Sequence, residues 1–427
     1  MKNLMCRLFL CIVLLAGAAD ALADWTQQFP DPHPTARGYH AMSYIGGDQA
    51  LLFGGLGDIK YNDTWLYDLS EGTWTLLDPP TKPLARSYHD MAYIGGDKVL
   101  MFGGHDGTND KTWLFDLSEG DWTQIIPQTK PLGQYGHCMS YIGGDQVAMF
   151  SAYTYADPYP YGGWLEDTWL YDLSEGNWIL IEPPAHPSHR AYAKMAYVGG
   201  DKAFMFGGFW FFDENWLFDL SEGTWTLLEP TNRPSGRHWH AMVSMGDDQA
   251  LMFGGCDTHP NGLTDETWIY DYSDNTWTLQ NPSVSPSPRR EVVMADIGGD
   301  HVLLFGGRTE AEEPRVYFDD TWIWNAEASP AATPSTAHLP ENFFLSQNYP
   351  NPFNAGTEIA YEIPKDVYVT LKVYNVLGVE VATLVDAYKE AGFHTVRWDA
   401  RNVASGVYFC TIWAGDFKAT KKMVMLK

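Results

Sequence analysis

One sequence motif, which we call the phrase, occurs six times along this chain, at intervals of about 50 residues between residues 24 and 325. In its second copy the phrase begins at Arg86, passes the pair Gly103 and Gly104, and ends with Trp113 and Trp122. Units that repeat at this interval cannot bury their apolar faces alone, so each unit packs against its neighbours. The repeat therefore predicts a ring or a stack of similar units.

Each copy contains four short runs that are typical of β-strands. In the first copy they cover residues 39–45, 50–53, 64–69 and 73–77, where apolar and polar residues alternate and aromatic residues are frequent. Gly46 and Gly47 separate the first two runs, and glycines favour the tight turn of an antiparallel hairpin. Four such strands are typical of a propeller blade, so the sequence predicts an all-β, six-bladed β-propeller over residues 24–325.

The glycine pairs and the tryptophans are the most regular parts of the phrase. Five copies carry a glycine pair at the end of the second run, whereas the third copy has Ser151 and Ala152 there. The third run of each copy carries a tryptophan: Trp65, Trp113, Trp169, Trp216, Trp268 and Trp322. This pattern resembles the kelch motif, and the resemblance implies a six-bladed, kelch-type ring.

A further tryptophan marks the fourth run of the first five copies but is missing after Trp324. The missing copy stands at the other end of the chain, where Asp24-Trp25-Thr26 matches Asp121-Trp122-Thr123. We therefore expect the N-terminal strand around Trp25 to supply the outer strand of blade six, which closes the ring and leaves no unpaired edge there.

Residues 1–23 have the features of a secretory signal peptide. Lys2 and Arg7 precede an apolar run over residues 8–15, and Ala21-Leu22-Ala23 precedes the expected cleavage before Asp24. The apolar run is too short to span a bilayer, and no later run approaches about 20 apolar residues. We expect export and no transmembrane segment.

The net charge of −27 is unevenly distributed. Residues 340–427 hold nine acidic and nine basic side chains, so the acidic excess lies before them. An acidic surface makes nucleic acid an unfavourable partner, because phosphate binding needs basic side chains. Solubility explains such a charge most simply, and attraction of cations or basic partners is the alternative.

The end of the chain differs in composition from the repeats. Residues 326–339 are rich in Ala, Pro, Ser and Thr and predict a linker. Residues 340–427 contain alternating strands separated by turn residues, which predict a small β-sandwich. Their opening Asn348-Tyr349-Pro350-Asn351-Pro352-Phe353, the turn Ala404-Ser405-Gly406 and the end Lys421-Lys422-Met423 stand in the order of the sorting domain of type IX secretion cargo, which they resemble.

The resemblance of residues 340–427 carries several implications. It implies an immunoglobulin-like sandwich that engages the type IX secretion machinery as a partner. It also implies a Gram-negative bacterium that exports the chain through the periplasm. The expected location is the medium or the outer cell surface.

The loops from the second to the third run of each blade vary most, and they share one face with the connections between blades. Variable loops on a rigid scaffold often carry function. Blades three and four have the most aromatic ones, and we take these residues as candidates for ligand binding: Tyr153, Tyr155, Tyr159, Tyr161, Trp164, Phe209, Trp210 and Phe211. Exposed rings stack on sugars or hold extended peptides, whereas the alternative is that these rings bury one another.

An arginine recurs at the start of the first run, on the same face. Arg37, Arg86, Arg190, Arg237 and Arg289 occupy this position, and Gln134 replaces them in blade three. A carboxylate stands before the third run in each blade. The arginines either bind an anionic ligand at the channel mouth or form the same internal brace in every blade. We favour the brace because a site used once does not need every copy, and we keep Arg37, Arg86 and Arg190 as candidates for ligand contact.

Function is also expected where one copy departs from the phrase. His238 and Trp239 replace a Gly and a Tyr, Arg290 and Glu291 do so in blade six, and Arg308 follows the last glycine pair. The candidates for acid–base chemistry are Arg237, His238, Arg289, Arg290 and Glu291.

Established catalytic and metal-binding motifs are scarce in this chain. The sequence contains no zinc-helix, nucleophile-elbow, phosphate-loop or dinucleotide motif, and we expect no metal and no cofactor. Kelch proteins include copper radical oxidases, whose cross-linked cysteine and tyrosine and histidine ligands find no match here.

The sequence thus predicts a secreted or surface-held recognition protein, which we expect to be a monomer. It would bind a glycan or a protein through the variable face of the propeller. The alternative is a sugar-modifying enzyme similar to six-bladed kelch mutarotases that act on sialic acid. A kelch ring alone does not decide between the two.

Overall fold

The structure is a computed structural model of the 427-residue chain. It describes residues 23–105, 110–154, 162–246, 248–257, 262–298, 301–309, 315–326, 343–345, 348, 353, 356–389, 392–401, 403–415 and 417–425. Within these residues every regular element is a β-strand. The predicted all-β fold is confirmed.

The described residues between 24 and 325 form six four-stranded antiparallel sheets, which are the blades. The first three blades contain the strands β2 (Ala41–Gly46), β3 (Gln49–Phe53), β4 (Thr64–Asp68) and β5 (Thr73–Leu77); β6 (Asp90–Gly95), β7 (Lys98–Phe102), β8 (Thr112–Asp116) and β9 (Asp121–Ile125); and β11 (Cys138–Tyr141), β12 (Gln146–Phe150), β15 (Thr168–Asp172) and β16 (Asn177–Ile181).

The other three blades contain the strands β17 (Lys194–Tyr197), β18 (Lys202–Phe206), β19 (Asn215–Asp219) and β20 (Thr224–Leu228); β22 (Ala241–Ser244), β23 (Gln249–Phe253), β25 (Thr267–Asp271) and β26 (Thr276–Gln280); and β27 (Val293–Asp296), β28 (His301–Phe305), β29 (Thr321–Asn325) and β1 (Asp24–Gln28). Blade six thus takes its fourth strand from the start of the chain, and Trp25 lies opposite Trp324 in the register of β1 and β29.

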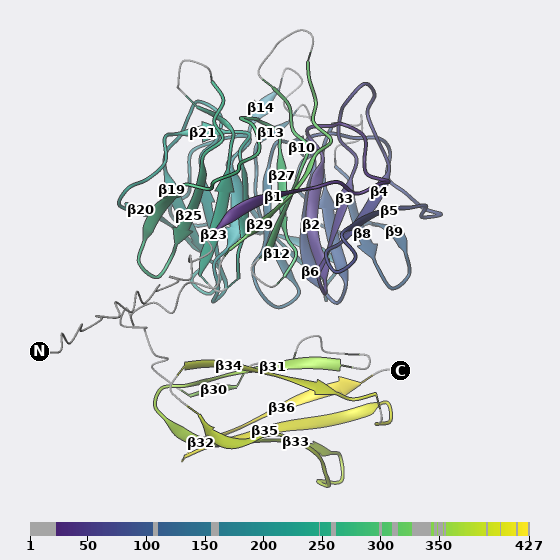
Figure 1. The fold of residues 1–427 in the computed structure, drawn as a ribbon, viewed down its shortest axis with the longest axis vertical. Coiled ribbons are helices and arrows are strands. Elements are labelled where there is room, and N and C mark those ends of the chain that lie inside the picture. The colour runs from purple at the N-terminus through teal and green to yellow at the C-terminus, as the bar shows by residue number, and fades with distance from the viewer. Residues whose placement is uncertain are drawn as a thin grey trace, which may run out of the picture.

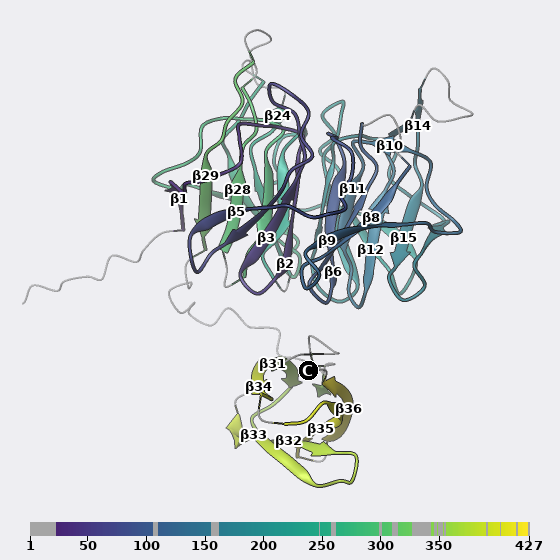
Figure 2. The same cartoon turned by 90° about the vertical axis from the view of Figure 1, so that its right-hand side faces the viewer.

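The blades are arranged in a ring (Figures 1 and 2), and their first strands line a central channel. Each lies beside the first strands of the two neighbouring blades, and β27 returns to β2. Loops that join second to third strands lie at the top of Figure 1, and we call this the upper face. Short strands build it up further: β10 (Gln134–Tyr135), β13 (Tyr153–Thr154) and β14 (Gly163–Trp164) in one sheet, and β21 (Arg237–His238) with β24 (Cys256–Asp257) in another.

The hydrophobic core lies between the blades, in one cluster per interface. The tryptophan of each fourth strand is almost completely buried there and donates its indole N–H to the first residue of the third strand in the preceding blade. The six hydrogen bonds, 2.8–3.1 Å long, are Trp25–Thr267, Trp74–Thr321, Trp122–Thr64, Trp178–Thr112, Trp225–Thr168 and Trp277–Asn215. The repeated tryptophan therefore joins neighbouring blades, which explains why it recurs in each copy.

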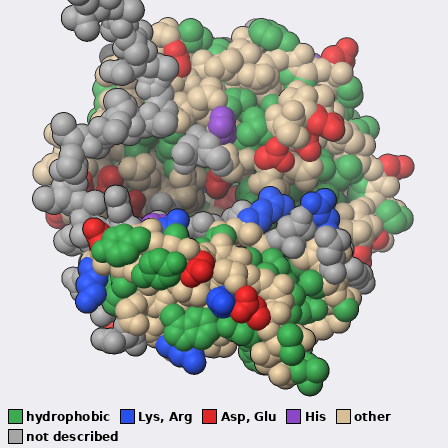
Figure 3. Space-filling model, turned by 60° about the horizontal axis from the view of Figure 1, so that its bottom comes forward, with side chains coloured by type: hydrophobic (Ala, Val, Ile, Leu, Met, Phe, Trp, Pro, Cys, Tyr) green, Lys and Arg blue, Asp and Glu red, His purple; other side chains and the backbone are tan. Residues whose placement is uncertain are grey.

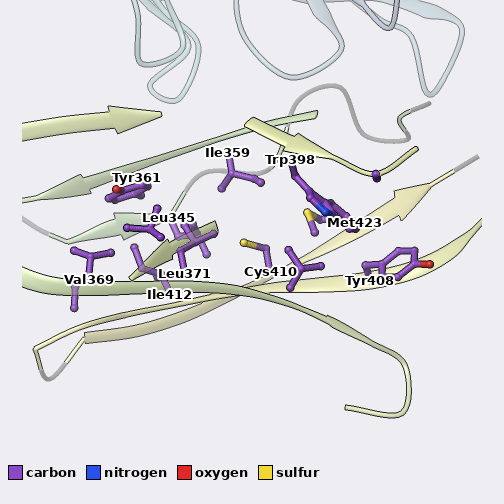
Figure 4. Packing of buried hydrophobic residues seen from close by; sticks show 14 of the residues in the cluster. Leu345, Ile359, Tyr361, Val369, Leu371, Trp398, Tyr408, Cys410, Ile412 and Met423 are labelled. Carbon is purple, nitrogen blue, oxygen red and sulfur yellow. The ribbon is translucent and has the colours of Figure 1, made fainter. Parts of the chain in front are cut away.

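Residues beyond 343 form a separate β-sandwich. One sheet contains β30 (Phe344–Leu345), β31 (Gly356–Ile363) and β34 (Gly392–Asp399), and the other contains β33 (Glu380–Lys389), β32 (Val367–Asn375), β35 (Gly406–Ala414) and β36 (Phe417–Met425). Their facing side chains make a core in which Leu345, Ile359 and Trp398 point toward Leu371 and Ile412 (Figure 4). Most basic side chains visible in Figure 3 gather on this domain.

The described residues contain no helix long and apolar enough to cross a membrane. Residues 1–22, where the signal peptide is expected, and most of the expected linker lie outside the described residues.

Candidate functional site

The upper mouth of the channel is lined by one residue from each blade. These residues are Tyr39, Tyr88, Gly136, Tyr192, Trp239 and Glu291, and we call them the collar. All six have a positive φ, between 56° and 74°, which is uncommon for residues that carry a side chain. The first strands were predicted from residue 39 onward, but β2 begins at Ala41 because Tyr39 has this left-handed backbone.

Backbone hydrogen bonds link the collar residues from blade to blade. The N–H of Tyr88 donates to the carbonyl of Tyr39, Gly136 to Tyr88, Tyr192 to Gly136, Trp239 to Tyr192 and Glu291 to Trp239, over 2.7–3.4 Å. The rings of Tyr39 and Tyr88 lie 4.0 Å apart, and those of Tyr192 and Trp239 lie 5.2 Å apart. The mouth is thus a hydrogen-bonded ring of aromatic residues that Gly136 and Glu291 interrupt.

A layer of buried histidines lies just below the collar. His40, His89, His137 and His240 each face edge-on the phenyl ring that ends the second strand of the preceding blade, at 5.6–5.8 Å. With the collar they line a small cavity of about 50 Å³. Burial lowers the pKa of all four imidazoles, and that of His137 to about 3, so they are neutral at pH 7.

A larger cavity of about 310 Å³ occupies the lower channel. The first strands line it, and Tyr44, Tyr93 and Tyr141 contact one another around it at 5.0 and 5.7 Å. Lys194 lines both cavities and lies 3.7 Å from Asp90. Asp90 and Lys194 occupy the same position of the repeat in blades two and four, where the other blades have Ala, Cys or Val.

Glu291 is the charged centre of the collar. Its carboxylate accepts a hydrogen bond from Arg308 Nε at 2.7 Å and lies 3.4 Å from Arg290 Nε. Burial raises the pKa of Glu291, although Arg308 and Tyr39 act in the opposite direction. The guanidinium of Arg290 lies 4.6 Å above the ring of Trp239. These groups place a buried carboxylate, two guanidiniums and aromatic rings at one mouth.

The aromatic residues of blades three and four form a second feature, beside the collar. We call Tyr153, Trp164, Phe209, Trp210 and Phe211 the platform. The Trp164 ring lies 4.9 Å from Tyr153 and 4.7 Å from Trp210, and it is stacked with Phe209 at 6.4 Å. Phe209 reaches the collar through Tyr192 at 6.4 Å.

The platform is packed internally on one side and open on the other. Trp210 is 49% exposed and Phe211 is 38% exposed. Both have a left-handed backbone, with φ of 73° and 61°. Gly236 packs so closely on the Phe211 carbonyl that a side chain there would clash, so only glycine fits beside this turn. Two strained residues that hold large rings in solvent mark a candidate contact surface.

The repeated arginines are buried, and their N–H groups donate to partners inside the protein. Arg37 pairs with Asp63 at 2.7 Å, Arg190 with Glu214 at 2.6 Å, Arg237 with Glu266 at 2.6 Å and Arg289 with Asp320 at 2.5 Å. Each also donates to the carbonyl of the first glycine in the pair of its own blade. This arrangement supports the brace interpretation and leaves these guanidiniums little capacity for a ligand.

Blades two and three modify the brace. Arg86 donates to Leu84 and Gly103 carbonyls, while Asp110 pairs with Lys130 at 2.5 Å. In blade three Gln134 Nε2 donates to Ser151 Oγ at 3.2 Å, and its Oε1 accepts the N–H of Ala152 at 2.8 Å. The loss of arginine and the loss of the glycine pair therefore go together, because the amide bonds a serine hydroxyl instead of a glycine carbonyl.

The predicted site residues separate into distinct places. His238, Arg290 and Glu291 meet at the mouth with Trp239, since the rings of His238 and Trp239 lie 4.4 Å apart. Arg37, Arg190, Arg237 and Arg289 belong to the braces, and Arg86 is buried. Tyr153, Trp164, Phe209, Trp210 and Phe211 form the platform. Tyr155, Tyr159 and Tyr161 lie outside the described residues.

Sequence reasoning missed the collar tyrosines and two polar neighbours of the platform. Tyr39, Tyr88 and Tyr192 stand before a His or Ala in the repeated phrase, but the sequence does not reveal their left-handed backbone. Glu166 and His189 stand in different loops, and only the fold joins them, at 2.9 Å.

Two family models match the chain. The one described as "KLHDC2/KLHL20/DRC7 Kelch-repeats domain" matches residues 79–255 and 208–341. The one described as "Secretion system C-terminal sorting domain" matches residues 347–426. Together they indicate a binding propeller with a tail for type IX export to the cell surface or the medium. No curated protein matches the chain.

Among solved structures, one similar to this chain is a novel fungal alcohol oxidase of the AA5 family in complex with copper. The sequences are 13% identical, the alignment covers 95% of this chain and 100% of that one, and the TM-score is 0.52. At this identity the likeness shows the fold alone.

The residues of this chain do not fit a copper centre with cysteine, tyrosine and histidine. Cys138 and Cys256 are buried, and the channel histidines pack on phenyl rings. No three His, Cys, Asp or Glu side chains gather as a metal site within the part of the chain that the structure describes.

Proposed function

Because the chain belongs to the kelch-repeat family and ends in a type IX sorting domain, we propose that it is an exported recognition protein whose upper face binds an extracellular glycan or protein. The observation that carries this proposal is the half-exposed Trp210 with Phe211, both held in a left-handed backbone. An apolar surface that is strained and exposed has a cost in stability, and binding explains why it is kept.

The contact surface extends from the platform to the collar. Ring contacts run from Trp210 through Trp164 and Tyr153 to Tyr135, and from there to Tyr88 at 5.8 Å. Rigid aromatic side chains supply much contact area at a low cost in conformational entropy. We propose that the collar rings of Tyr88 and Tyr192 form the inner end of the same surface.

Capture on an array of glycans and peptides tests this function. The exported protein is compared with Trp210→Ala, Trp164→Ala and Glu291→Gln. Recognition through the platform predicts that the two tryptophan variants lose capture and that Glu291→Gln keeps it. Equal capture by all four proteins would contradict it.

The second candidate function is an enzyme that acts on sugars at the channel mouth. The observation that favours it is Glu291, whose pKa burial raises and which lies beside Arg290, Arg308 and Tyr39. A buried carboxylate that holds its proton more firmly is suited to general acid–base work. In a mutarotation assay by NMR, this function predicts that Glu291→Gln abolishes turnover while Trp210→Ala retains it.

We also propose how the chain leaves the cell and in what form. The first 23 residues would act as a signal peptide in a Gram-negative bacterium, with cleavage before Asp24. Strand β1 completes blade six, so the ring closes within one chain, which supports a monomer. N-terminal sequencing of the exported protein and its mass in solution test these two points.

A further inference from the structure

We propose that the platform is the subsite for a neutral, hydroxyl-rich sugar unit, which stacks on Trp210 and bonds to Glu166 and His189. This inference rests on the recognition function proposed above and names its ligand chemistry. It assigns a carbohydrate role to two residues that lie in different loops of the upper face.

The geometry places two polar side chains directly beside the exposed ring. The imidazole of His189 lies 5.4 Å from the Trp210 ring and 5.6 Å from the Trp164 ring. Glu166 Oε1 accepts hydrogen bonds from the backbone N–H of His189 at 3.0 Å and from its Nδ1 at 2.9 Å. Both side chains remain accessible, with 40% of Glu166 and 43% of His189 exposed.

The hydrogen bonds determine what these side chains can still offer a ligand. Since Nδ1 of His189 pairs with Glu166, Nε2 is the ring nitrogen that remains to face a ligand. Burial tends to raise the pKa of Glu166, but the hydrogen bonds from His189 lower it overall, so the carboxylate is charged at pH 7. Its Oε2 lies 3.9 Å from His186 Nδ1, which is too far for a hydrogen bond.

The subsite therefore combines an aromatic plane with a carboxylate acceptor and an imidazole nitrogen at its edge. A pyranose ring has an apolar C–H face that packs on an indole and hydroxyl groups at its rim that donate hydrogen bonds. A ligand made only of acceptors would offer no donor to Glu166.

The charges around the platform select against acidic sugars. Glu166 repels a ligand carboxylate, and the nearby guanidiniums are already paired. Arg190 bonds Glu214 and lies 4.4 Å above the ring of Phe212, while Arg233 pairs with Asp213 at 3.3 Å. The excess of acidic residues in the propeller region acts in the same direction. A neutral glycan is the ligand that these groups favour.

Calorimetric titration of the full exported chain tests the subsite. The probes are neutral hexaoses built from glucose, xylose or mannose, an oligogalacturonate, sialyllactose and a lysine-rich peptide. The variants are Trp210→Ala, Trp210→Phe and Glu166→Gln. Phe29→Ala and Glu222→Gln serve as controls because they remove an exposed ring and an exposed carboxylate elsewhere.

We expect at least one neutral hexaose to bind and the acidic sugars not to bind. Trp210→Ala should weaken binding about tenfold or more, Glu166→Gln should weaken it severalfold, and Trp210→Phe should retain part of it. The controls should match the parent protein. Binding of the peptide or the acidic sugars through Trp210, without a neutral sugar, would overturn the sugar subsite and leave the recognition function standing. Binding of no probe and no array ligand would overturn both.

Discussion

The indole Nε1 of Trp25 donates a hydrogen bond to Thr267 Oγ1 at 2.9 Å, across 242 positions of the sequence. This bond joins the N-terminal strand, which belongs to blade six, to blade five. The same bond between a fourth-strand tryptophan and the preceding blade recurs around the ring. The repeated phrase therefore encodes the junctions between blades, and the start of the chain completes the last one.

Trp25→Ala should lower the free energy of unfolding by about 3–5 kcal/mol, because it removes a buried indole from a close-packed interface. Chemical denaturation of the exported protein measures this change. Trp122→Ala, at the same position in blade two, is the matched control and should cost a similar amount. A much smaller loss for Trp25→Ala would mean that the ring is held closed without the N-terminal strand.

Arg289→Gln should destabilise the ring by about 3–5 kcal/mol, since it leaves Asp320 partly buried without its charged partner. Lys130→Gln breaks the more exposed pair with Asp110 and should cost about 1 kcal/mol or less. Neither change should affect ligand capture, which is read on the same samples. Loss of capture in folded Arg289→Gln would point to a ligand role for the arginine instead.

Acid should destabilise the propeller from about pH 6.5 downward, where histidine in the unfolded chain begins to bind protons. The folded imidazoles stay neutral because burial lowers their pKa, to about 3 for His137. Stability then falls by about 1.4 kcal/mol per pH unit for each such imidazole. Denaturation curves between pH 7 and pH 5 measure this slope.

His137→Ala isolates one imidazole, and Ala193 already occupies the equivalent position in blade four. The fall of its stability per pH unit should be smaller by the contribution of one histidine, whatever the stability of the variant at pH 7. The raised pKa of Glu291 and of Asp90 acts in the opposite sense and is common to both proteins. Equal slopes for the two proteins would show that His137 is protonated in the folded state.

Trp210→Gly should have a free energy of unfolding about 1–2 kcal/mol higher than Trp210→Ala. It should therefore unfold at a higher temperature. Both variants lack the indole, but at φ of 73° alanine is strained and glycine is not. Thermal melts of the two proteins give the comparison directly. Equal melting temperatures would mean that the turn relaxes, and that the strain is not held by the surrounding structure.

The fold could be predicted from the sequence because the same strand and turn signals recur in six copies. Glycine turns, strand alternation and the tryptophan positions all describe one blade. The start of the first strand was misplaced by two residues, since Tyr39 carries no sign of its left-handed backbone. That conformation depends on hydrogen bonds from neighbouring blades, which local sequence does not show.

The candidate site was harder to predict from the sequence, because it too depends on contacts that local sequence does not show. Aromatic composition pointed to Trp164 and Trp210, but only their packing separates the buried side of the platform from the exposed one. The pairing of Glu166 with His189 joins two loops and follows no spacing rule. Departures from the phrase at His238 and Glu291 did indicate the channel mouth, where the fold brings them beside Trp239.

Hydroxyl-radical footprinting of the full exported protein, with and without a captured ligand, tests the central claim most directly. Mass spectrometry of the oxidised chain reports which side chains the ligand covers. We predict protection of Trp210 and Phe211 on the upper face and no change at Tyr44 and Tyr141 in the lower channel. Protection confined to the lower channel, with the platform still fully oxidised, would contradict recognition through the upper face.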